Sequence, residues 1–350
     1  MTVTLNFALV LAGGSALGAY EGGAYEALAA AGLTPGWIAG SSIGALNAGI
    51  IAGNRPETRV ARLREFWQRA SAPGSAVGEG GMLTRSLQIT NALRNRFLGR
   101  PGVFRLNFSG LFSIVPGAPD EPALYDLSPL RETLSALIDI GRLNSGEVRL
   151  SVQAVDVVSG EPIVFDTAHQ QVTLDHLIAS ASLMPDFPPV TIDGRDFVDG
   201  GFTANAPVGI ILDSAPERDL LCLVIDLFPI AGPRPRSWFD GMQRRDDLIF
   251  SQQTANALRE HAKRKALRDE LRSLLGRLPP GLLDERDRAR LGQEVGSGTV
   301  SVVRMEFRAT GEETALKTFD YSRSAIERRW RQGVQDMERL APTLPILTGP

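Results

Sequence analysis

The chain has 350 residues, of which 43% are hydrophobic and 22% charged, a composition typical of a globular protein with a large core. Its net charge of −3 argues against nucleic acid as the main partner, because a phosphate-binding surface needs an excess of basic side chains. The only cysteine, Cys222, excludes an internal disulfide and is expected to be buried, and one cysteine with three scattered histidines predicts no metal site.

Neither a targeting signal nor a membrane span is evident. Residues 1–6 contain no Lys or Arg, and the apolar run behind them is short, so the sequence predicts no secretory signal. The longest apolar run, Leu220 to Ile230, is interrupted by Asp226 and is too short to cross a bilayer. We therefore expect a cytoplasmic protein whose contact with lipid, if any, is peripheral.

The N-terminal segment predicts a βαβ unit. Residues 7–11 form a continuous apolar run typical of a strand buried on both faces, residues 19–30 have a helical pattern, and a second strand begins at Trp37. A glycine loop, Ala12-Gly13-Gly14-Ser15-Ala16-Leu17-Gly18, joins the first strand to the helix.

The glycine loop does not match the usual phosphate-binding patterns. Ser15 stands where a dinucleotide fingerprint needs its second glycine, and Gly18-Ala19-Tyr20 is not the end of a P-loop. Two interpretations remain: an oxyanion hole built from the backbone N–H groups of Gly13, Gly14 and Ser15, and a purely structural turn.

Gly40-Ser41-Ser42-Ile43-Gly44 follows the second strand and opens another helical run, which predicts a nucleophile elbow with Ser42 at its tip. Gly40 and Gly44 fit this turn because strand and helix approach too closely for a Cβ atom at either position. Ser42 would then lie near the positive end of a helix, where a developing oxyanion is stabilised. The alternative is a Gly/Ser-rich βα turn that matches by chance.

The middle of the chain alternates helical and extended patterns. Helices are expected at 55–70, 127–134 and 174–183, and a hairpin at 149–158 and 162–165. The segment 71–120 lacks periodicity and is rich in Gly, Ser and Pro, with scattered phenylalanines. It predicts either a mobile lid over an apolar cleft or a long connection whose aromatic side chains pack on the core.

Asp199 ends a short strand and is followed by Gly200 and Gly201, so its carboxylate can lie at an open sheet end. Asp-Gly is also a common turn dipeptide. A serine nucleophile needs a base, however. His169 lies in a polar loop, His176 on an expected helix, and His261 in a charged helix where we expect it to be exposed to solvent.

Only one strand precedes the strand that leads to Ser42, which fits poorly with an α/β-hydrolase triad and better with a Ser–Asp dyad.

The C-terminal part predicts strands at 220–228 and 299–307, a charged helical region at 237–291 and a final helix at 322–340. Ten Lys/Arg against six Asp/Glu lie between 258 and 290. This basic excess favours either an anionic membrane surface or, as a commoner case, a solvated helical face or a packing arm for a second subunit.

Three motifs in this order, the glycine loop, Gly40-x-Ser42-x-Gly44 and Asp199-Gly200-Gly201, resemble the patatin-like phospholipase family over residues 7 to about 227. The stretches 125–134, 187–194 and 319–323 are similar to a bacterial subgroup with an extra C-terminal region. The resemblance implies a three-layer α/β/α sandwich with a mainly parallel sheet. It implies a catalytic domain at 1–232, with a loop-rich insertion at about 71–120, and a mainly helical extension at 233–350 that packs on it.

The resemblance also implies a serine lipid acyl hydrolase of the phospholipase A or esterase type, which acts through an acyl-enzyme without metal or cofactor. Its expected substrate is a lipid or another acyl ester, and peripheral membrane contact and a homo-oligomer stay open. Carried over by position, Ser42 is the nucleophile and Asp199 the general base. The remaining residues implied for the site are the oxyanion-hole amides of Gly13, Gly14 and Ser15 and the structural glycines Gly18, Gly40, Gly44, Gly200 and Gly201.

Two departures from the family pattern matter. Ser15 replaces a glycine of the loop, and Leu17 replaces a basic residue. They leave open an alternative function, a non-catalytic or weakly catalytic lipid- or acyl-binding protein on the same fold.

Overall fold

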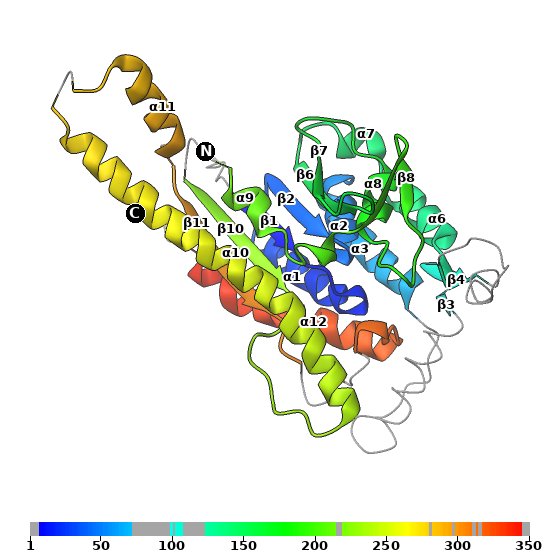
Figure 1. Cartoon of the computed structure of the whole chain (residues 1–350). Coiled ribbons are helices and arrows are strands. Elements are labelled where there is room, and N and C mark those ends of the chain that lie inside the picture. The colour runs from blue at the N-terminus through cyan, green and yellow to red at the C-terminus, as the bar shows by residue number, and fades with distance from the viewer. Residues whose placement is uncertain are drawn as a thin grey trace.

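The structure is a computed structural model that describes residues 7–71, 99–100, 102–107, 123–214, 219–279, 282–295, 298–309, 313 and 317–344 (Figure 1). Most of the segment 71–120, for which the sequence leaves a lid and a long connection open, lies outside these residues. Within it, Phe104 is buried, with its ring centroid 4.8 Å from that of Tyr125 and 5.3 Å from that of Phe187.

A mainly parallel sheet lies at the centre of the molecule, in the order β11-β10-β1-β2-β6-β9-β8, with β7 paired to β6. Its parallel strands are β1 (Phe7–Leu11), β2 (Trp37–Ser41), β6 (Arg149–Asp156), β10 (Leu220–Asp226) and β11 (Val300–Glu306). The antiparallel strands are β7 (Pro162–Asp166), β8 (Val190–Ile192) and β9 (Arg195–Asp199). The sheet continues into the C-terminal part of the chain, because β11 pairs with β10 over its whole length.

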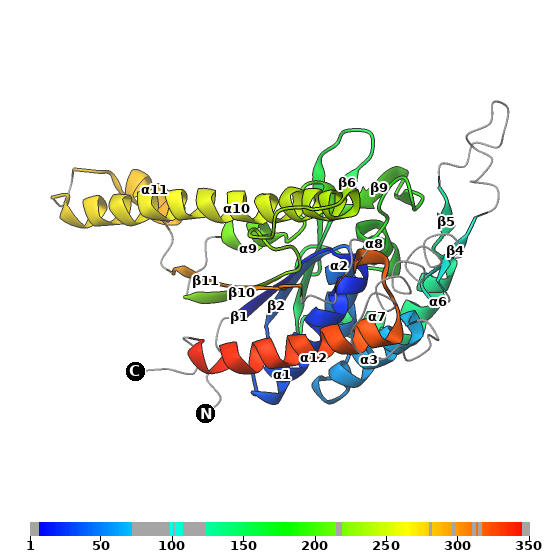
Figure 2. The same ribbon diagram turned by 90° about the horizontal axis from the view of Figure 1, so that it is seen from below.

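Helices cover both faces of this sheet, as the three-layer prediction requires. Figure 2 shows α9 and α10 on one side of the sheet and α1, α3 and α12 on the other. The helices are α1 (Ala19–Ala30), α2 (Ile43–Ala52), α3 (Pro56–Ala70), α6 (Ser128–Leu137), α7 (Ile140–Leu143), α8 (Leu174–Ser180), α9 (Val208–Leu212), α10 (Trp238–Arg277), α11 (Glu285–Val295) and α12 (Arg323–Leu340). The short 3₁₀ turns are η1 (Ser15–Gly18), η2 (Gly200–Phe202), η3 (Lys317–Phe319) and η4 (Ala341–Thr343).

A small antiparallel sheet of β3 (Gly99–Arg100), β4 (Phe104–Leu106) and β5 (Tyr125–Asp126) lies beside α6.

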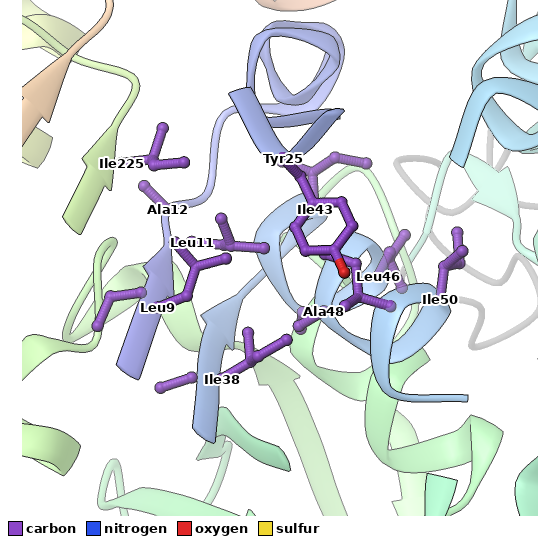
Figure 3. Packing of buried hydrophobic residues seen from close by; sticks show 14 of the residues in the cluster. Leu9, Leu11, Ala12, Tyr25, Ile38, Ile43, Leu46, Ala48, Ile50 and Ile225 are labelled. Carbon is purple, nitrogen blue, oxygen red and sulfur yellow. The ribbon is translucent and has the colours of Figure 1, made fainter. Parts of the chain in front are cut away.

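The core forms where β1, β2 and α2 meet. Every residue of β1 is buried, which explains its uninterrupted apolar sequence. Figure 3 shows side chains from these elements packed together, among them Leu9, Leu11, Ile38, Ile43 and Leu46. On the neighbouring strand Cys222 is fully buried, as predicted, and burial raises the pKa of its thiol to about 12.

The C-terminal helix α12 packs on α1 at backbone distance. A Cβ atom on Gly23 would lie 1.9 Å from the carbonyl oxygen of Trp330, and one on Gly333 would lie 2.0 Å from that of Tyr20. Only glycine permits such an approach at these positions. Because α1 follows the glycine loop directly, this contact places the C-terminal region beside the N-terminal βα turn.

The other C-terminal helix, α10, runs along the opposite face and continues beyond the sheet, where α11 folds back against it (Figure 1). The projecting part exposes Leu267, Leu274 and Leu282 at 69%, 50% and 66% of their surfaces. Among the described residues, no helix combines the length and the apolar character that a membrane crossing needs.

Candidate active site

Ser42 occupies the turn between β2 and α2 in a conformation that few non-glycine residues adopt, with φ 55° and ψ −128°. The flanking glycines explain how the turn closes. A Cβ atom on Gly40 would lie 2.6 Å from the carbonyl of Gly44, and one on Gly44 would lie 2.3 Å from the carbonyl oxygen of Leu11. The geometry is that of a nucleophile elbow with its serine at the N-terminus of a helix.

Ser180, at the end of α8, fixes the backbone of this turn. The Ser42 N–H donates to both the carbonyl oxygen and the Oγ of Ser180, at 3.1 and 3.0 Å. The Ser180 hydroxyl in turn donates to the carbonyl oxygen of Gln153 on β6, at 2.6 Å. The Ser42 amide is therefore already engaged, and the reactive feature of Ser42 is its hydroxyl.

Asp199 faces that hydroxyl from the end of β9. Ser42 Oγ donates to Asp199 Oδ2 at 2.6 Å, across 157 positions of sequence. The second carboxylate oxygen, Oδ1, accepts from the Gly201 N–H at 2.7 Å. Gly200 is required between them, because a Cβ atom there would lie 2.3 Å from the carbonyl oxygen of Gln153.

The environment of Asp199 changes its acidity. Burial raises the pKa of its carboxyl from the ordinary value of 3.8 to about 7, and the hydrogen bonds from Ser42 and Gly201 oppose this rise only in part. Its side chain is only 2% exposed. A carboxyl with a pKa near neutrality can both accept and release a proton at physiological pH.

The glycine loop lies against the side chain of Ser42. A Cβ atom on Gly13 would come within 3.0 Å of the Cβ atom of Ser42 and 2.5 Å of Oδ1 of Asn205. The Gly13 N–H, however, donates to the carbonyl oxygen of Asn205 at 2.8 Å, and Asn205 Nδ2 donates back to the Gly13 carbonyl oxygen at 3.0 Å. Of the three amides that the sequence predicts for an oxyanion hole, Gly13 is thus engaged elsewhere. Those of Gly14 and Ser15 have no acceptor among the described residues.

The two departures in the loop have different consequences. Ser15 takes φ 53°, the left-handed region natural to the glycine that it replaces. Leu17 is fully buried, so its position carries no charge toward the site. Gly18 packs under the elbow helix, where a Cβ atom would lie 2.6 Å from the side chain of Ile43.

The histidines take no part in this arrangement. His169 is exposed, and His176 Nδ1 accepts from the backbone N–H of Thr173 at the start of α8. The expectation that His261 is exposed is wrong. Only 7% of its surface is accessible, and burial lowers its pKa. One face of α10, the charged helix that carries His261, packs on the rest of the protein. Because charged residues occur all round this helix, the sequence does not indicate which face is buried.

Two residues of the C-terminal region contact the site in ways that the sequence does not reveal. From α10, Gln253 Oε1 accepts from the Asn205 N–H at 2.8 Å, and its Nε2 donates to the Gly201 carbonyl oxygen at 3.3 Å. Tyr321, just before α12, shares a hydrogen bond with Ser15 Oγ at 2.8 Å. Tyr321 belongs to one of the stretches that resemble the bacterial subgroup, but nothing in its sequence context indicates this role.

The described residues contain no cluster of three or more His, Cys, Asp or Glu side chains arranged to hold a metal ion. The site itself brings together the buried Asp199 carboxylate, the Ser42 hydroxyl and the backbone N–H groups of Gly14 and Ser15.

Two family models match the chain. The model of the patatin-like phospholipases matches residues 9–212, and a model described as patatin phospholipase matches residues 248–343. No curated protein matches.

Among solved structures, VipD from Legionella pneumophila is similar, with 14% identity, a TM-score of 0.41, and 97% of this chain and 67% of that one covered. The type III effector protein ExoU is similar with 13% identity, a TM-score of 0.31, and 96% and 52% covered. The chain thus spans about two thirds of the length of VipD and about half of the length of ExoU. With more than half of its residues matched by the first family model, the chain belongs to the patatin-like phospholipase family.

Proposed function

We propose that the protein is a serine lipid acyl hydrolase of the phospholipase A or esterase type, which cleaves carboxylic esters through a Ser42–Asp199 dyad. The observation that supports this most strongly is the 2.6 Å hydrogen bond from Ser42 Oγ to Asp199 Oδ2. It joins the hydroxyl of a strained elbow to a buried carboxylate. Family membership supports a lipid substrate.

In the proposed reaction, Asp199 Oδ2 accepts the proton of Ser42 as Oγ attacks the carbonyl carbon of the ester. The oxygen that gains negative charge is stabilised by the N–H groups of Gly14 and Ser15 and by the N-terminus of α2. Collapse of this intermediate breaks the bond to the alcohol oxygen, which takes the proton from Asp199, and leaves an acyl group on Ser42. Water then attacks the acyl carbon and gives a proton to Asp199 Oδ2. As the bond to Ser42 Oγ breaks, Asp199 returns this proton to Oγ, which releases the fatty acid and restores the enzyme.

Gly13 has a different part in this scheme from the one that the sequence predicts. Its N–H is engaged by Asn205, so Gly13 orients the loop, while Gly14 and Ser15 supply the donors. The engaged amide holds the start of the loop beside Ser42, whose Cβ atom would lie 3.0 Å from one on Gly13.

Hydrolysis of short- and long-chain p-nitrophenyl esters and of phospholipid vesicles tests the proposal. Ser42→Ala and Asp199→Asn should each lower kcat by a factor on the order of 10³ without changing the fold. Ser41→Ala is the matched control, because its hydroxyl is buried one residue away without a hydrogen-bond partner among the described residues. That variant should stay active. Turnover that survives in Ser42→Ala contradicts the proposal.

A further inference from the structure

We propose that Tyr321 is a positioning residue for the oxyanion hole: its hydroxyl keeps Ser15 in the left-handed conformation that aims the Ser15 N–H at the reacting carbonyl oxygen. This inference rests on the proposed function. It assigns to the C-terminal region a part in the reaction itself, in addition to its part in the fold.

Ser15 needs such a contact because it is not glycine. Its φ of 53° brings the Cβ atom close to the backbone, a conformation that L-residues other than Asn and Asp seldom adopt. Rotation about the N–Cα bond to a negative φ would relieve this strain. Because that rotation turns the peptide that carries the Ser15 N–H relative to the side chain, relaxation changes the direction in which this donor points.

The hydrogen bond to Tyr321 opposes this rotation. Ser15 Oγ lies 2.8 Å from Tyr321 Oη, and the bond joins positions 306 residues apart. A neighbouring contact links the same two segments. Arg329 Nη1 donates to the carbonyl oxygens of Ala16 and Asp320, at 3.1 and 2.9 Å. Residues 15–16 of the loop and residues 320–321 are therefore joined at two adjacent points.

Tyr321 is itself held rigidly enough for this role. Its ring is 4% exposed and stacks on Trp67 with a centroid distance of 6.5 Å, and the guanidinium of Arg100 lies 5.7 Å from its centroid. Burial raises the pKa of its hydroxyl, so the group stays protonated and able to share a hydrogen bond throughout the physiological range. The rigid ring makes the position of Oη independent of the loop.

A positioning role differs from simple packing in its dependence on residue 15. The Tyr321 hydroxyl should affect kcat only when residue 15 has a Cβ atom, because only then is the positive φ strained. Tyr321→Phe keeps the ring and removes the hydrogen bond, and Ser15→Ala removes the same bond from the other side. Each should lower kcat for a p-nitrophenyl ester about tenfold while KM changes less than twofold. Ser15→Gly also loses the bond but adopts positive φ without strain, so it should keep kcat within about twofold of the wild type.

The decisive comparison is the double variant. In the Ser15→Gly background, Tyr321→Phe should have no further effect on kcat, although in the Ser15 background it costs about tenfold. Tyr20→Phe is the matched control. Tyr20 is also buried, and its hydroxyl donates to Asp336 of α12 at 2.9 Å, away from the loop. Tyr20→Phe should lower the midpoint temperature of thermal unfolding and leave kcat unchanged.

The inference is overturned if Tyr321→Phe keeps wild-type kcat, if its loss is the same with Gly at position 15, or if Ser15→Gly is as impaired as Ser15→Ala. Should Tyr321→Phe not fold, the inference is still overturned if Ser15→Ala keeps wild-type kcat or if Ser15→Gly loses as much of it. Ser42→Ala separates the two claims. Turnover that persists in Ser42→Ala overturns the proposed function together with this inference, whereas Ser42-dependent turnover with an additive double variant overturns this inference only.

Discussion

At the scale of single residues, strain and burial prepare the site before any substrate arrives. Ser42 and Ser15 have φ angles of 55° and 53°, which for residues with a Cβ atom cost about 1–2 kcal/mol each. Asp199 is buried next to a neutral hydroxyl rather than a cation, so its ionised form is disfavoured. The fold stabilises these three residues in conformations and environments that isolated residues avoid. In the proposed reaction these residues supply an activated hydroxyl, its base and an N–H donor.

The raised pKa of Asp199 predicts the pH dependence of the reaction. The base must be ionised to accept the proton of Ser42, and burial raises its pKa to about 7. The value of kcat/KM for an ester should therefore rise with pH, with a midpoint near 7, and level off in mildly alkaline solution. Initial rates followed from about pH 5 to about pH 9 give this profile.

A histidine could produce a similar profile, so the control is His261→Gln. His261 is buried and lies outside the site, and its replacement should leave the midpoint unchanged. A rate that is constant or falls over this range would contradict the assignment of Asp199 as base.

At the scale of elements, the closest contact between the N- and C-terminal parts is the packing of α12 on α1. Gly22, Gly23 and Gly333 form this contact, and the side chain of Trp330 fills the space above Gly22. The Trp330 indole N–H also donates to Glu26 at 2.6 Å. Because α1 begins where the glycine loop ends, this packing places α12 next to the loop.

Gly333→Ala should lower the free energy of unfolding by about 1–3 kcal/mol, because its Cβ atom would meet the backbone oxygen of Tyr20, which cannot move aside as a flexible side chain can. Gly292→Ala in α11 is the matched control. A Cβ atom there meets nothing within 4 Å, and alanine favours a helix over glycine by up to about 1 kcal/mol. Thermal unfolding followed by circular dichroism measures both. A Gly333→Ala protein at least as stable as the wild type would show that the helices can separate freely.

At the scale of the whole molecule, the region matched by the second family model packs closely with the region matched by the first and shares its sheet. Strand β11 extends the sheet beside β10, and α10 and α12 cover opposite faces of it (Figure 2). From these two faces Gln253 and Tyr321 contact the two loops that form the site. Two buried ion pairs lie within the C-terminal part: Arg329 of α12 with Glu313, and Lys317 with Asp247 of α10.

Local patterns in the sequence predict much of this molecule. The buried strand at 7–11 and the elbow at Ser42 follow from short runs of apolar residues and glycines, which depend only on neighbours in the chain. The mainly parallel sheet follows from the resemblance of the motifs to the family. The pairing of Ser42 with Asp199 follows from chemical need, since a serine requires a base, and from the resemblance of the motifs.

Other features depend on contacts between distant residues and could not be predicted. The carbonyl of Asn205 that engages the Gly13 N–H lies 192 positions away, and Tyr321 lies 306 positions from Ser15. The burial of His261 depends on which side of α10 faces the protein, which a helix with charges all round does not indicate. These contacts form only in the tertiary structure, so local patterns in the sequence do not predict them.

The formation of a covalent adduct on Ser42 is the most direct test of the central claim. The purified protein treated with a fluorophosphonate and examined by intact and peptide mass spectrometry should carry one adduct, on the peptide that contains Ser42. Ser41→Ala should be labelled in the same way and Ser42→Ala not at all. A wild-type protein that remains unlabelled, or an adduct that persists in Ser42→Ala, would contradict the assignment of Ser42 as the nucleophile.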